Sequence, residues 1–241
     1  GMETKLLELM DTVMKKEDVV PVMKEAKRAF EGILVDKEQL RPVIGVVGEI
    51  FVRLNRFSNN HLVENLEELG AEVWVAPFSE WIFYINNIKK EDYMQDKDII
   101  GWTKISIADT VARADEHEVL RPFRKFLRSG HEPTAEENVK MGSTYVHPSF
   151  RGETIMSLGK AVDFYRTGLS GVINVMPFTC MPGTVVNSML KRVKQDCEDI
   201  PVLNIAYDGL DMSNNTLRLE AFVHQCSQYM EKNMKAELAG V

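Results

Sequence analysis

The sequence predicts an α/β protein whose core is a four-stranded parallel sheet of the Rossmann or flavodoxin-like kind, with a helical insertion and amino-terminal helices. Four short apolar runs, mostly β-branched, are bounded by Gly or Pro. Such runs are typical of strands buried on both faces of a parallel sheet. Helical patterns separate the runs, as βαβ units require. The predicted strands are 43–48, 72–76, 171–176 and 201–205.

Right-handed crossovers between these strands favour the order 2-1-3-4. In that order the third strand pairs with the first, although the second strand and a long helical stretch lie between them in the sequence. The competing architecture has two separate small α/β lobes, each with one pair of strands.

Two helical blocks flank the first two strands. Residues 2–40 have apolar side chains at helical spacing, with Pro21 restarting the pattern, and predict amino-terminal helices. Residues 79–150 contain no comparable strand pair and predict a helical insertion or lid, with helices over 79–87 and 106–127.

The α/β domain itself is predicted over 41–78 and 151–237. Asn59 or Asn60 is expected to cap its first helix, which Gly70 ends. Later helices are expected over 153–165 and 183–196. A closing helix, capped by Asp211 or Ser213, is expected to end near 235.

Composition excludes several classes of protein. The chain has 241 residues, 29 Lys and Arg against 36 Asp and Glu, and a formal charge of −7. An acidic chain does not favour nucleic acid or an anionic membrane surface as partner. No apolar run approaches the roughly 20 residues of a membrane helix. Three cysteines without a secretory signal predict reduced thiols and a cytoplasmic location.

Ligands of open parallel sheets bind beyond the carboxyl ends of the strands, at the point where the strand order reverses. In the predicted order this switch point lies between the first and third strands. It is expected to bring Gly48 and Glu49 close to the loop over 177–183. Glu49 is predicted to be an acid, a base or a hydrogen-bond acceptor, and Asp208 follows the fourth strand as a predicted ligand-binding residue.

Cys180 is the most informative cysteine, because it precedes a predicted helix. A helix N-terminus favours a thiolate, which acts as a nucleophile or as a soft metal ligand. Alternatively, Cys180 is a small apolar residue that fills a tight turn. Cys197 and Cys226 are expected to be inert, and no CxxC pair is present.

The loop over 48–60 is long for a connection between a strand and a helix. Its arginines, close to a helix start, predict binding of a phosphate or carboxylate. Alternatively, they pair with nearby carboxylates in a structured loop. The loop lacks both GxGxxG and GxxxxGK[ST]. The ligand-binding residues predicted in this loop and in the one after the third strand are Gly48, Arg53, Asn55, Arg56, Ser58, Asn59, Phe178 and Thr179.

Three sets of strings together resemble the acyl-CoA dehydratase activase-related proteins, which are relatives of 2-hydroxyacyl-CoA dehydratase subunits. The first set is GEIFVRLN at 48–55, FSNN at 57–60 and PFSEW at 77–81. The second is RGE at 151–153 and VMPFTCMPGT at 175–184, and the third is NIAYDG at 204–209 and RLEAF at 218–222. The resemblance covers about 41–230, and the chain looks like the carboxy-terminal part of such a protein.

This resemblance implies a three-layer α/β fold and Fe–S redox chemistry linked to ATP-driven electron transfer or 2-hydroxyacyl-CoA dehydration. It implies a [4Fe–4S] cluster with Cys180 as a metal ligand. The implied partners are an activase ATPase module or a dehydratase subunit, an acyl-CoA ligand and a second copy of the chain. No cysteine precedes Cys180 and no DxGxT phosphate loop is present. The chain is therefore not expected to be active alone. The alternative is a non-catalytic α/β domain that binds a CoA-like anion or a partner.

Overall fold

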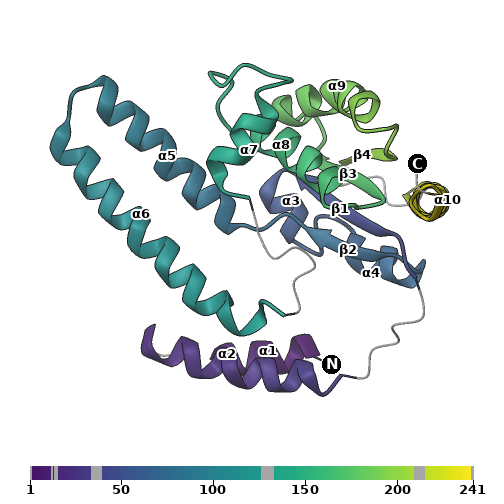
Figure 1. The fold of residues 1–241 in the computed structure, drawn as a ribbon, viewed down its shortest axis with the longest axis horizontal. Coiled ribbons are helices and arrows are strands. Elements are labelled where there is room, and N and C mark those ends of the chain that lie inside the picture. Colours follow the sequence, from purple (N-terminus) through teal and green to yellow (C-terminus); the bar gives the residue numbers. More distant parts are fainter. Residues whose placement is uncertain are drawn as a thin grey trace. The chain divides into compact units, whose positions relative to one another are not determined.

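The computed structural model describes residues 2–11, 13, 16–33, 40–125, 133–208 and 215–239. The chain divides into two compact units (Figure 1). The helical unit comprises residues 1–39 and 83–132, and the α/β unit comprises 40–82 and 133–241.

The α/β unit contains one parallel sheet of four strands in the order β2-β1-β3-β4, which confirms the predicted fold class and strand order. Two separate lobes are excluded, because β1 pairs with both β2 and β3. The observed strands match the four predicted runs to within two residues. They are β1 (Val43–Gly48), β2 (Glu72–Val75), β3 (Gly171–Pro177) and β4 (Val202–Tyr207).

Helices cover both faces of the sheet, so each face has its own apolar core (Figure 1). One core packs the sheet against α8 (Glu153–Arg166) and α9 (Met181–Asp196). The other packs it against α4 (Leu62–Glu68) and α10 (Asn215–Ala239). Burial on both faces explains why β1 and β3 are continuous apolar runs.

The second sequence segment of the α/β unit begins at residue 133, earlier than the predicted residue 151. Helix α7 (Ala135–Gly142) belongs to it, although the predicted insertion extended to residue 150. Helices α7 and α8 approach closely through two glycines. A Cβ on Gly159 would lie 2.0 Å from Asn138 O, and one on Gly142 would lie 2.2 Å from Ile155 O. The two helix backbones can come this close because neither glycine has a Cβ.

The helical unit contains α1 (Met2–Asp11), α2 (Lys16–Glu31), most of α5 (Ser79–Gln95), α6 (Ile99–Leu120) and the short 3₁₀ helix η1 (Arg121–Phe123). The buried carboxylate of Asp109 joins α5 to α6, because it accepts hydrogen bonds from Asn86 and Lys90 on α5. Arg113 also donates to it. Burial alone would raise the pKa of Asp109, but these donors hold it below its ordinary value.

Several helix bounds differ from the predicted ones. Helix α5 extends beyond the predicted end at residue 87, and helix α6 starts well before the predicted residue 106. The side chain of Asp98 accepts a hydrogen bond from Gly101 N and thereby starts α6 early. The predicted caps Asp211 and Ser213 lie outside the described residues. None of the helices in the described ranges is both long and apolar enough to cross a bilayer.

We expect Gly48→Ala to lower the free energy of unfolding by about 2–5 kcal/mol. Gly48 has a φ of +111°, and an added Cβ would lie 2.0 Å from Val175 O on the neighbouring strand. Gly152 is the matched control, because its φ is +112° but its Cβ would meet nothing within 4 Å. Urea denaturation of both variants checks this, and equal losses would show that the strand contact is unimportant.

Candidate functional site

The carboxyl ends of β1, β3 and β4 border a cleft of about 700 Å³. Its position is the one predicted from the switch point between β1 and β3. Three predicted site residues line it, namely Glu49, Ser58 and Asp208. The other lining residues are Phe51, Val52, Phe57, Asn60, His61, Pro177 and Tyr207.

Glu49 begins the loop after β1 and ties that loop to the sheet. Its backbone N–H donates to Val175 O at 2.9 Å, which continues the pairing of β1 with β3. Its carboxylate accepts hydrogen bonds from Phe51 N at 3.1 Å and Val52 N at 2.7 Å. Glu49 therefore caps α3 (Ile50–Leu54), a short helix inside the region predicted to be a loop. An acid or base role for Glu49 remains a prediction.

The two arginines of this loop do not line the cleft. Arg53 is only 8% exposed, and its Nη1 faces Gly48 O at 3.5 Å. Burial lowers the pKa of Arg53, while the charges of Glu80, Glu153 and Glu49 oppose that shift. Arg56 forms an ion pair with Glu64 on α4. Arg56 therefore agrees with the alternative in which the arginines pair with nearby carboxylates, whereas Arg53 contacts a backbone carbonyl and lies within the electrostatic influence of three glutamates.

Asn55 and Asn59 shape the loop through hydrogen bonds. Asn55 Oδ1 accepts from Ser58 N at 2.9 Å. Asn59 is buried, and its Nδ2 donates to Val52 O at 2.9 Å and to Arg53 O at 3.2 Å. Its Oδ1 accepts from Leu62 N at 3.2 Å, although His61 rather than Asn59 or Asn60 occupies the N-cap position of α4. Both asparagines thus support the turn that presents Ser58 to the cleft.

The loop after β3 follows the cleft wall at Pro177. Phe178 is exposed, Thr179 has a φ of +68°, and Cys180 is the N-cap residue of α9. Cys180 N donates to Pro177 O at 3.1 Å, and Thr184 Oγ1 donates to Cys180 O at 2.8 Å. The side chain of Cys180 is partly exposed.

The two other cysteines are buried in different cores, on opposite faces of the sheet. Burial raises the pKa of the Cys197 thiol to about 11 and also raises that of Cys226. Within the described ranges, no three His, Cys, Asp or Glu side chains come together as a metal site. A [4Fe–4S] cluster is held by four thiolates, so its complete ligand set does not fit this chain alone.

No protein-family model, curated protein or solved structure matches this chain. A functional proposal therefore depends on the geometry of the site and on the motif strings of the sequence.

A buried ion network lies beside the loop after β1, and sequence reasoning missed it. Lys160 on α8 is only 1% exposed, and its Nζ lies 2.8 Å from Glu80 Oε1 and 3.1 Å from Asp163 Oδ2. Lys160 lines a cavity of about 20 Å³ together with Arg53 and Glu153, and this volume is enough for one water molecule. Nearly every side chain of α8 from 154 to 162 is buried. A lysine in so apolar a helix must be paired, which is the signal that could have revealed the network.

Glu153 connects this network to the loop after β1. Its Oε1 accepts a hydrogen bond from Ile50 N at 3.2 Å. Burial raises the pKa of Glu153, with the charge of Glu49 adding to the rise and the amide of Ile50 and the charge of Arg53 opposing it. Glu153 also lines a shallow groove of about 560 Å³ with Leu54.

Ionisation of Glu153 should lower the unfolding free energy of the native chain as pH rises, and we expect Glu153→Gln to abolish this pH-dependent decrease. A carboxyl whose folded pKa is raised contributes fully below its unfolded pKa of about 4.3 and loses that contribution as pH passes the folded pKa. The variant should therefore gain in unfolding free energy over the native chain from pH 4 towards pH 7. Urea midpoints at several pH values measure this gain.

The exposed Glu67→Gln is the control for the loss of one carboxylate. A gain in Glu153→Gln that does not change between pH 4 and pH 7 would contradict the burial of Glu153 described above.

Proposed function

We propose that this chain is a ligand-binding module of an acyl-CoA dehydratase activase-related system, and that its ligand lies in the cleft. The observation that carries this proposal is the convergence of distant strings on one site. Phe57, Pro177 and Tyr207 come from three different strings of the resemblance, and all three line the cleft. The parallel strands bring these segments to one edge of the sheet, and the resemblance strings supply the residues that line the cleft there.

The walls of the cleft suit a ligand with an apolar part. Phe51 is 62% exposed and Phe57 is 89% exposed, so both offer a large apolar surface. Ser58, Asn60 and Asp208 add polar groups at the same walls. Small-molecule sites typically combine apolar walls with a few polar groups that orient the ligand. In this proposal the aromatic side chains contact the acyl part of an acyl-CoA.

Cys180 is the proposed metal ligand, contributing one thiolate to a [4Fe–4S] cluster that another chain completes. An activase ATPase module or a dehydratase subunit would supply the remaining ligands, because a second copy of this chain would add only one more accessible thiolate. Its neighbours Phe178 and Met181 are 64% and 65% exposed. An exposed apolar edge of this kind is typical of a surface that a partner covers. The cytoplasm is the proposed location, because thiols remain reduced there.

Cys180→Ala should lower the iron and acid-labile sulfide content at least tenfold relative to the native chain, when each is reconstituted anaerobically with ferrous iron and sulfide together with the dehydratase subunit that supplies the other thiolates. The reason is that Cys180 is partly exposed, whereas the two other cysteines are buried. Cys197→Ala should retain the native iron content, because Cys197 lies in the core. Iron and sulfide assays measure both. Equal iron in the native chain and in Cys180→Ala would contradict the proposed ligand.

A second candidate is a non-catalytic domain that binds an acyl-CoA without a cluster. Both carboxylate oxygens of Glu49 accept hydrogen bonds at the start of α3, which favours a structural task for this residue. Of the three cysteines only Cys180 is even partly exposed, which is too few for a cluster of its own. In this candidate the cleft binds its ligand whether or not Cys180 is present.

For that candidate, calorimetric titration with butyryl-CoA should give binding that Phe57→Ala weakens about tenfold. Full burial of a Phe side chain contributes about 1.5–3 kcal/mol, and about 1.4 kcal/mol corresponds to a tenfold change. Leu217→Ala is the control, because Leu217 is exposed on α10 but does not line the cleft. Absence of heat with butyryl-CoA would reject the cleft as an acyl-CoA site.

A further inference from the structure

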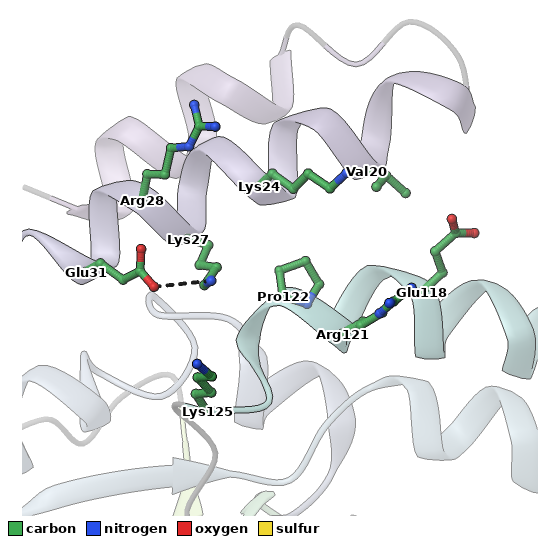
Figure 2. Close-up of a pocket in the computed structure, with 9 residues that line it drawn as sticks. All are labelled: Val20, Lys24, Lys27, Arg28, Glu31, Glu118, Arg121, Pro122 and Lys125. Atoms are coloured by element: carbon green, nitrogen blue, oxygen red, sulfur yellow. Dashed lines mark ion pairs between the residues drawn. The ribbon is translucent and has the colours of Figure 1, made fainter.

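The helical unit contains a hollow of about 570 Å³ between α2 and the chain around η1 (Figure 2). This volume lies within the range of small-molecule sites. The hollow belongs wholly to the helical unit and is separate from the cleft of the α/β unit. Neither the resemblance nor the proposed function involves it.

Basic residues dominate its lining. Helix α2 contributes Lys24, Lys27 and Arg28, and η1 with the residues after it contributes Arg121 and Lys125. The carboxylates among the lining residues are Glu31, which pairs with Lys27 at 3.2 Å, and Glu118. This is a local reversal of charge in a chain whose formal charge is −7.

The cations face the hollow from two sides. In Figure 2, Lys27 and Lys125 point towards one another from α2 and from the chain after η1, with Pro122 beside the space between them. Arg28 turns its guanidinium away from the hollow in this view. Lys24, Lys27, Arg121 and Lys125 are therefore the cations on which a ligand would depend.

The arrangement is unfavourable for the protein alone. Lys24 and Lys27 on α2 and Arg121 and Lys125 around η1 line the same hollow, and like charges held close to one another repel. An apolar contact nevertheless holds the two basic segments together. The rings of Phe30 and Phe123 meet edge to face, with centroids 5.7 Å apart. A bound anion would relieve the repulsion between segments that this contact keeps close.

We propose that this hollow binds a pyrophosphate group, either free or as the diphosphate of a nucleotide. Against the two carboxylates of Glu31 and Glu118, three lysines and one arginine leave a surplus of two positive charges, which is more than a single carboxylate ligand would match. A pyrophosphate presents several charged oxygens, which lysines bind as point charges and arginine binds through its fork of donors. The volume of the hollow also leaves room for the organic part of a nucleotide.

Calorimetric titration of the full chain with inorganic pyrophosphate, ADP and adenosine at low ionic strength tests this site. Pyrophosphate and ADP should bind, adenosine should not, and affinity should fall as salt rises because exposed charges are screened. Tighter binding of ADP than of pyrophosphate identifies a nucleotide as the ligand, and equal affinities identify the free anion. Absence of heat with both phosphates overturns the proposal.

A pair of double variants separates this site from a general effect of charge. Lys24→Gln with Arg121→Gln should weaken pyrophosphate binding at least tenfold. Lys89→Gln with Lys104→Gln removes the same charge from exposed positions of α5 and α6 outside the hollow, and should change affinity less than twofold. Equal losses in the two double variants overturn the proposal, and far-UV circular dichroism verifies that both fold. Because the cleft is unchanged in these variants, their result is independent of the proposed function.

Discussion

The pairing of β1 with β3 is the constraint on which the rest of the α/β unit depends. These strands lie on opposite sides of the helical insertion in the sequence, yet they pair from Ile44 with Gly171 to Gly48 with Val175. The pairing places β2 on one side and β4 on the other. The connections that follow β1 and β3 therefore diverge at the centre of the sheet, and the cleft opens between them.

Buried polar groups hold this edge in one geometry. Asn174 in β3 donates to Asn204 Oδ1 in β4 at 3.0 Å, which fixes the register of two strands that end at the cleft. Beneath the loop after β1, Lys160 binds carboxylates from α5 and α8. Burial makes such pairs sensitive to the loss of either partner, because an unpaired charge would remain in an apolar site. The loop that carries Glu49 therefore lies on a rigid base.

The two units differ in where their charge lies. In the α/β unit the charges of Arg53, Glu80 and Lys160 are buried beside the loop after β1, and none of them lines the cleft, whose walls are aromatic and polar. In the helical unit the basic side chains line an open hollow. Buried charges position a loop, whereas cations at an open hollow remain available to a ligand. The two proposed sites therefore use different chemistry, apolar contact in the first and electrostatic attraction in the second.

The strands, their order and the edge that carries the cleft could be predicted from the sequence. The run from Val43 to Gly48 is apolar throughout, and its burial on both faces follows from that pattern alone. The positions of the site loops followed in turn, because parallel strands end at a common edge. Helix α3 could not be predicted in this way, since it has only five residues and depends on the cap from Glu49.

Only the tertiary structure decided where the charged side chains point. The sequence places Arg53 and Arg56 in the loop after β1, but only the fold buries Arg53 near the charges of Glu80 and Glu153 and pairs the exposed Arg56 with Glu64. These three carboxylates come from three other segments of the chain. Lys160 and the basic residues around Phe30 and Phe123 are ordinary helix residues until their neighbours are known. The physical reason is that apolar periodicity is a local property of the chain. Electrostatic pairing depends on distance through space, which only the folded chain defines.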